Sequence, residues 1–287
     1  PQEKVGFLLM ELLYGNTPAG RSILGPKENI ESFSRKNFLE YHKTHYTAEK
    51  SIVVVVGDLK ESQVKSEILK QFKNISSGNK VGKLAVKENQ RKPAMLISKK
   101  KTEQTHMIVA FQGFKGRDKR SLALSLLAAV LGKGFSSRLF EKLRDEMGAC
   151  YYVGAGNDEY TDHGFLAISA GVESRRLKEV LKVILKECLH LTKELVTIEE
   201  LNKVKDYLVG NLYLRLETSD ALATFYAMDE IVKGELETPK ELEEKIRSIT
   251  PKAIQKVAKE IFQNKNLNLA VVGDIKNPQK LKKILKL

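Results

Sequence analysis

The sequence predicts an α+β fold of two homologous α/β layers, each a mixed sheet with stacked helices, the first truncated at its N-terminal side. Three observations support this prediction. The chain has 287 residues, a length typical of about two domains. Residues 32–60 align without a gap on residues 248–276. Upstream of the second of these segments, strands come first and stacked helices follow, which is the order of an α+β layer.

The repeated segment contains a helix, a short polar turn, an apolar run and a Gly-Asp pair. Val55-Val56-Gly57-Asp58 corresponds to Val271-Val272-Gly273-Asp274, an offset of 216 positions (248 minus 32). Self-similarity of this kind indicates a repeated structural unit. By the layout of the second copy, about 120 residues before Pro1 would complete the first. Since the chain does not begin with Met, we expect it to be processed, trimmed or taken from a longer protein.

The first repeat is predicted to hold three helices and one strand. Apolar spacing predicts a helix over Gln2–Tyr14, and Ser34 is placed to cap a second helix that ends near Tyr46. The β-branched run Ile52–Val56 predicts a buried strand, followed by a helix over Lys60–Phe72. Glycine and proline punctuate the loop Thr17–Pro26.

A truncated first repeat should expose apolar surface. The face of the first helix that carries Val5, Leu8, Leu9 and Leu12 is the clearest example. We expect another chain to cover it.

Polar residues with glycine at 74–90 make the best linker candidate in the chain. We therefore predict three parts. Residues 1–80 form the C-terminal half of the first repeat, residues 81–93 form the linker, and residues 94–287 form a complete second repeat.

The second repeat opens with predicted strands over Ala94–Ser98 and Thr105–Phe111, followed by a helix over Arg120–Leu131. A glycine hinge, Gly132-Lys133-Gly134, separates this helix from a shorter one that Ser136 caps and that ends at Gly148. Strands over Tyr151–Ala155 and Gly164–Val172 then pair across the polar turn Asn157–His163. Further helices, a strand and a short Lys-rich helix complete the repeat: Ser174–Leu191, a helix opened by the capping box at Thr197, Ser219–Lys233, helices opened by Thr238-Pro239 and Thr250-Pro251, and the strand Leu267–Val272.

Composition excludes several functional classes. The net charge is +13, but the lysines alternate with glutamates along helices and the chain has no Trp, so a nucleic-acid-binding module is not expected. No apolar run reaches the roughly 18 residues that a membrane span needs. Nor is there a signal-like segment at the start of the chain. Two cysteines form neither a disulfide framework nor a metal cage, which suggests a reducing compartment, and we expect the cytoplasm.

Arg144 and Tyr151 are the candidate functional residues. The helix–hinge–helix–strand arrangement of residues 127–155 projects them from the end of a helix and the start of a strand. There they could hold a substrate backbone or an oxyanion. The alternative is structural, with an arginine that complements a helix dipole and an aromatic residue in a strand core.

Two runs of residues resemble a known family over the whole chain. LLYGNTPAGRSILGPKENI (residues 12–30) and LGKGFSSRLFEKLRDEMGACYYV (residues 131–153) resemble the pitrilysin/insulinase family of zinc metallopeptidases, most closely its processing-peptidase-like branch. The resemblance implies two homologous α+β halves that form a clamshell around a chamber for unfolded peptides. It also implies that the first half carries H-x-x-E-H, whose two histidines bind zinc with a glutamate further downstream.

This chain lacks that zinc motif. None of its five histidines lies in an H-x-x-E-H sequence, and the counterpart of the zinc helix at Leu126–Gly132 contains no ligand. We therefore expect zinc in the complete protein and none bound by this chain. His42 and His45 share a helix face and could bind a metal, but no third ligand is evident.

The resemblance also implies roles for Arg144 and Tyr151. They match an arginine and a tyrosine of the second half that reach the substrate, with Gly148 at the family's glycine between them. Arg144 would anchor a substrate carbonyl, and Tyr151 would donate a hydrogen bond to the developing oxyanion. The neighbouring Tyr152 should point to the opposite face of its strand.

The predicted function is therefore part of a zinc-dependent endopeptidase that degrades or processes unfolded peptides, with this chain supplying the non-catalytic, substrate-binding second domain. The alternative is a non-catalytic family member that acts as a partner or structural subunit. Expected partners are an unfolded peptide or protein substrate, and the missing N-terminal part or another chain that completes the first domain, in a homo- or hetero-dimer.

Overall fold

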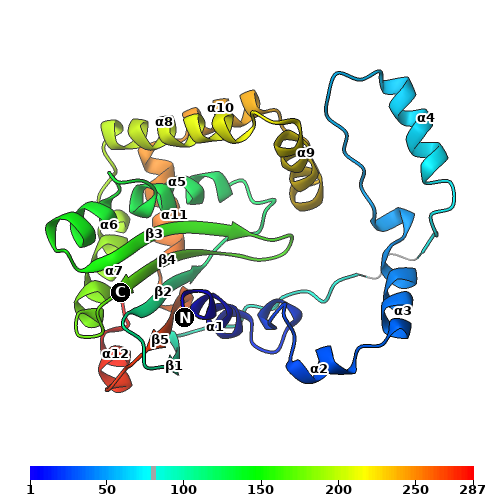
Figure 1. The fold of residues 1–287 in the computed structure, drawn as a ribbon. Coiled ribbons are helices and arrows are strands. Elements are labelled where there is room, and N and C mark those ends of the chain that lie inside the picture. The colour runs from blue at the N-terminus through cyan, green and yellow to red at the C-terminus, as the bar shows by residue number, and fades with distance from the viewer. Residues whose placement is uncertain (79–81) are drawn as a thin grey trace.

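The computed structural model describes residues 1–78 and 82–287. The predicted boundary between residues 80 and 81 lies outside these described residues. Figure 1 shows that the strands and most of the helices form one layered body, while α2, α3 and α4 stand away from it. Within the described part of the chain, no helix combines the length and the apolar character that a membrane crossing requires.

A five-stranded mixed sheet lies at the centre of the layered body, as the fold class predicts. Its order is β1-β5-β2-β4-β3, and all neighbours are antiparallel except the parallel pair β1 and β5. This order places β3 at one edge of the sheet, next to β4 alone. The strands are β1 (Ala94–Lys99), β2 (Thr105–Gln112), β3 (Cys150–Glu159), β4 (Gly164–Val172) and β5 (Leu267–Gly273).

Helices cover one face of the sheet and form the main core. Alternate residues of β2, Met107, Val109 and Phe111, are buried against them because side chains alternate between the two faces of a strand. The helical part of this repeat comprises α5 (Ser121–Gly132), α6 (Arg138–Phe140) with its continuation η3 (Glu141–Glu146), α7 (Leu177–Lys193), α8 (Ile198–Arg215), α9 (Ser219–Met228) with η4 (Asp229–Lys233), α10 (Pro239–Ser248), α11 (Pro251–Ile261), η5 (Asn264–Asn266) and α12 (Pro278–Ile284).

A helix from the first repeat covers the other face of the sheet (Figure 1). It is α1 (Gln2–Tyr14), whose Val5 and Leu9 are each 2% exposed and pack with Ile108 and Val272 of the sheet. The expectation that another chain covers this face of α1 is therefore wrong. The sequence pattern reveals an apolar face but not which surface it meets.

The rest of the first repeat repeats the local structure of the second. It contains η1 (Pro18–Gly20), α2 (Lys27–Ser32), α3 (Arg35–His45), η2 (Ala48–Lys50) and α4 (Glu61–Gln71). At the offset of 216 positions, the bounds of α3 coincide with those of α11, and the bounds of η2 with those of η5. The internal repeat is thus a structural one.

The predicted buried strand Ile52–Val56 is wrong for this chain. The segment forms no strand, and Ile52, Val53 and Val55 are between 45% and 48% exposed. Its counterpart β5 lies between two neighbouring strands, β1 and β2. A strand requires hydrogen-bond partners on its edges, and the described residues provide none for Ile52–Val56.

Two local predictions also need correction. Ser137, rather than Ser136, occupies the N-cap position of α6, and its hydroxyl donates to the carbonyl of Gly134 at 2.8 Å. The predicted turn Asn157–His163 is shorter than expected, because β3 continues to Glu159.

Candidate functional site

The turn from η3 into β3 positions both predicted site residues. Gly148 has φ +53°, in the left-handed region that glycine adopts without a Cβ penalty. The amide of Ala149 donates to the carbonyl of Leu143 at 2.7 Å and closes the turn. The sequence therefore produces a sharp helix-to-strand reversal at this glycine.

Arg144 lies on η3, a π-helical turn, and its side chain reaches back to the start of β3. Its Nη1 donates to the carbonyls of Cys150 at 2.8 Å and Tyr151 at 2.7 Å. The structure thus brings Arg144 and Tyr151 together through the backbone. The side chain of Arg144 remains exposed, and π-helical turns of this kind are frequent at functional sites.

Tyr151 projects from an irregularity in the strand. The register with β4 shifts between Cys150, which faces Val172, and Tyr152, which faces Gly171. Tyr151 is the extra residue, and bulges of this type redirect a side chain. Its side chain is 51% exposed, and its hydroxyl has no hydrogen-bond partner among the residues that the structure describes.

Tyr152 follows the irregularity, and the strand alternation that predicts opposite faces for the two tyrosine rings is interrupted between Cys150 and Tyr152. The side chain of Tyr152 packs against the sheet itself. Its ring lies over Gly171, where a Cβ would meet the ring at 2.3 Å, and its hydroxyl lies 3.0 Å from Nδ1 of His106. Burial raises the pKa of Tyr152 and lowers the pKa of His106. The polar end of Tyr152 is thus bound within the chain, whereas that of Tyr151 is available to a ligand.

Sequence reasoning missed a second arginine at this turn. Arg176, the residue before α7, donates from Nη1 to the carbonyls of Met147 at 2.9 Å and Gly148 at 3.2 Å. It also pairs with Glu179 at 2.9 Å. Local sequence carries no signal for this contact, because Arg176 lies far along the chain from the turn that it stabilises.

The described residues do not fit a zinc ion. They contain no group of three or more His, Cys, Asp or Glu side chains that could hold a metal. The rings of His42 and His45 pack on Tyr46 and Tyr41, at centroid distances of 4.7 and 4.2 Å. We therefore assign no metal chemistry to the residues that the structure describes.

The fold is a mixed α/β layer with a sharp helix-to-strand turn, and its described residues contain no metal-binding cluster. The family model described as peptidase M16 inactive domain matches residues 32–208. This chain therefore belongs to the peptidase M16 family and contains its inactive domain.

Proteins that are similar to this chain in sequence carry the name zinc protease. The chain is 28% identical to the uncharacterized zinc protease YmxG of Bacillus subtilis, over 91% of this chain and 63% of that protein. It is 30% identical to an uncharacterized zinc protease of Rickettsia bellii, over 91% of this chain and 62% of that protein. The chain thus spans less than two thirds of the length of either relative.

Solved structures share the fold. A protease from Helicobacter pylori matches 95% of this chain and 67% of its own with a TM-score of 0.85 and 21% identity. A peptidase M16 inactive domain from Pseudomonas fluorescens matches 97% of this chain and 67% of its own, with a TM-score of 0.87 and 19% identity. A chain of complex III2 from Candida albicans reaches the same TM-score at 16% identity.

Proposed function

We propose that this chain is the substrate-binding, zinc-free part of a zinc-dependent endopeptidase that degrades or processes unfolded peptides. Zinc would be held by the part of the complete protein that this chain lacks, in a chamber between two homologous halves. The names of the relatives support a zinc protease, and the turn that presents Arg144 and Tyr151 supports an assisting role for this half.

The observation that carries the proposal is the half-exposed Tyr151 beside Arg144 at the edge strand β3. Among the described residues β3 pairs only with β4. An edge strand can accept an extended peptide by backbone hydrogen bonding, and this mode requires an unfolded substrate. Tyr151 would then donate a hydrogen bond from its hydroxyl group to the oxyanion that forms at the cleaved carbonyl. Arg144 would hold a neighbouring substrate carbonyl by a charge-assisted hydrogen bond.

A second candidate is a non-catalytic family member that acts as a partner or structural subunit. Its specific support is the likeness in fold to a chain of complex III2 from Candida albicans. Under either function the exposed apolar residues Ile52, Val53 and Val55 require completion of the first repeat, by the missing N-terminal part or by another chain in a homo- or hetero-dimer. We also propose a cytoplasmic location, since Cys150 and Cys188 are both unpaired and buried.

The test compares the complete protein with this chain alone. We expect the complete protein to contain about one zinc per chain and to hydrolyse an unstructured peptide in a chelator-sensitive manner. This chain alone should bind no stoichiometric zinc and should not cleave the peptide. A complete protein without zinc or peptidase activity would favour the structural subunit instead.

A further inference from the structure

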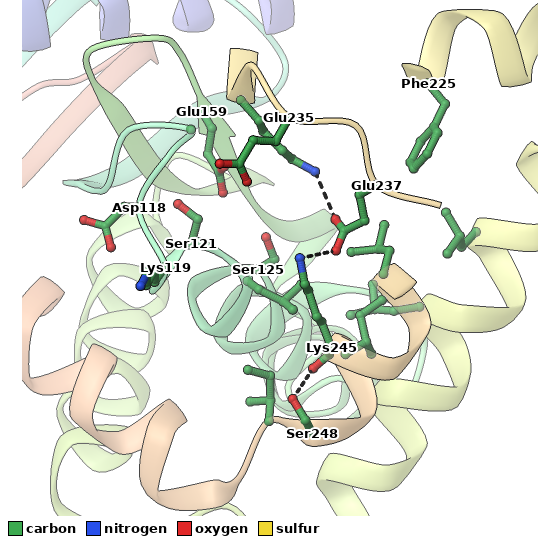
Figure 2. Close-up of a pocket in the computed structure, with 18 of the residues that line it drawn as sticks. Asp118, Lys119, Ser121, Ser125, Glu159, Phe225, Glu235, Glu237, Lys245 and Ser248 are labelled. Atoms are coloured by element: carbon green, nitrogen blue, oxygen red, sulfur yellow. Dashed lines mark hydrogen bonds and ion pairs between the residues drawn. The ribbon is translucent and has the colours of Figure 1, made fainter. Parts of the chain in front are cut away.

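A large cavity lies among the helices, apart from the turn that carries Arg144 and Tyr151. It has a volume of about 1010 Å³ and is lined by residues of α5, α8, α9, α10 and the end of β3. Figure 2 shows polar side chains and Phe225 around this space. Pockets for small molecules range from roughly 300 to 1,000 Å³, so the cavity is large enough for an organic ligand.

One wall of the cavity is apolar. It is formed by Leu122 of α5, Leu208 and Leu212 of α8, Phe225 of α9 and Leu242 of α10. Contact with hydrocarbon in place of water lowers the free energy of such a surface. A ligand of this cavity should therefore have an apolar body.

Two of the cations that line the cavity are already neutralised. Glu237 is 8% exposed, and its carboxylate accepts ion pairs from Lys245 at 2.5 Å and Lys233 at 3.4 Å. Figure 2 shows this carboxylate next to the ammonium group of Lys245. Lys233 also pairs with Asp229 at 2.7 Å. The two lysines and two carboxylates together hold the end of η4 against α10 and carry no net charge.

Lys133 and Arg215 also line the cavity, but neither forms an ion pair within 4.0 Å in the described chain. Lys133 is half-buried, and burial together with the positive charge of Arg215 lowers its pKa. Asp158 opposes this effect without reaching ion-pair distance. The two charges repel each other, and an anion bound by both removes that cost.

The acidic residues of the cavity limit the charge of such an anion. Glu159 accepts a hydrogen bond from Asn157 at 2.8 Å, and Asp118 accepts two from Arg120 at 2.8 and 2.6 Å. Glu235 lines the exposed mouth. A singly charged group fits this balance better than a doubly charged phosphate.

We propose that the cavity binds a carboxylate attached to an apolar body, with Lys133 and Arg215 holding the carboxylate by charge-assisted hydrogen bonds. The same chemistry is offered by a medium-chain carboxylic acid and by the free C-terminus of an apolar peptide. This site is independent of the peptidase function proposed above, because neither Arg144 nor Tyr151 lines it.

Calorimetric titration of this chain tests the site with matched probes. Decanoate is compared with 1-decanol, and N-acetyl-Leu-Leu-Phe as the free acid is compared with its amide. We expect at least one carboxylate to bind, with its neutral counterpart on the order of tenfold weaker or worse. Binding of decanoate alone assigns the site to carboxylic acids, and binding of the peptide acid alone assigns it to peptide C-termini.

The variants Lys133→Met and Arg215→Gln should each weaken carboxylate binding by on the order of tenfold. Lys203→Gln is the matched control, because Lys203 lies on the same helix as Arg215 and is exposed outside the cavity. It should leave the affinity unchanged. Equal affinity for acid and neutral probes, no binding of either acid, or unchanged affinity in both cavity variants would overturn the proposal. Arg215 is exposed, so its substitution tests the site even where Lys133→Met reduces folding.

Discussion

At the scale of single residues, the candidate site depends on a backbone turn that Gly148 permits and two arginines stabilise. Arg176 donates to the carbonyls of residues 147 and 148, before the turn residue Ala149. Arg144 donates to the carbonyls of residues 150 and 151, after it. Because these donors come from different elements, the turn is held on both sides. The position of Tyr151 follows from that rigidity.

Gly148→Ala should destabilise the chain by about 1–2 kcal/mol, since an L-residue is strained at φ +53°. Urea unfolding measures the change. Gly156→Ala is the matched control, because this strand glycine has ordinary φ and a Cβ there would meet nothing within 4 Å. Equal stability of the two variants would show that the turn tolerates a side chain.

His106 should make the stability of the fold depend on pH. Burial lowers its pKa in the folded chain below the ordinary 6.5, so between these two values the unfolded chain binds more protons. Stability should therefore fall as the pH falls through about 6.5, by up to about 1.4 kcal/mol per unit of pKa shift. Urea unfolding at several pH values should show a smaller fall for His106→Gln than for the parent chain. An identical pH profile for His106→Gln and the parent chain would contradict the account.

The sequence predicted Arg144, Gly148 and Tyr151 as a group because they lie close together along the chain. It did not predict the contacts of Arg176 or the pairing of His106 with Tyr152. Those contacts join residues that only the sheet and the packing of α7 bring together. Local pattern identifies a turn, but tertiary structure determines its supports.

At the scale of elements, the two repeats separate local from non-local determinants of structure. The helices α3 and α11 occupy equivalent positions, since helical hydrogen bonds are local. The β-prone segment after each helix becomes a strand only in the second repeat, where β1 and β2 flank it. For this reason the sequence predicted the helices well and was wrong about Ile52–Val56.

The offset of 216 positions also relates α1 to α9. Residues 2–14 map onto 218–230, which include α9 (Ser219–Met228). Whereas α1 packs on the sheet, α9 has no buried residue, and Met228 at its C-terminal end is 52% exposed. We expect α9 to pack on the sheet of a completed first repeat, as α1 packs on the sheet of the second.

Hydrogen exchange measures this completion directly. In the complete protein the amides of residues 52–56 should become protected by several orders of magnitude relative to this chain, because they join a sheet. The amides of β5 should be protected in both proteins and serve as the internal reference. Rapid exchange of residues 52–56 in the complete protein would contradict the structural equivalence of the two repeats.

At the scale of the whole molecule, the chain combines an edge strand, an exposed tyrosine and an arginine without any metal-binding cluster in its described residues. It also spans less than two thirds of the length of its zinc protease relatives. The central proposal is a division of labour in which another part of the complete protein would hold the metal and this part would hold the substrate. The net charge of +13 does not by itself identify a binding partner, since many of the lysines pair with glutamates on the same helix.

The most direct test of this claim is kcat/KM of the complete protein for an unstructured peptide, compared between Tyr151→Phe and Tyr152→Phe. Both substitutions remove one hydroxyl and keep the ring, but only the hydroxyl of Tyr152 is bound within the chain, to His106. The account predicts a loss on the order of a hundredfold for Tyr151→Phe at unchanged zinc content, as for a lost oxyanion donor, and little change for Tyr152→Phe. A kcat/KM for Tyr151→Phe within about twofold of the parent enzyme would contradict it.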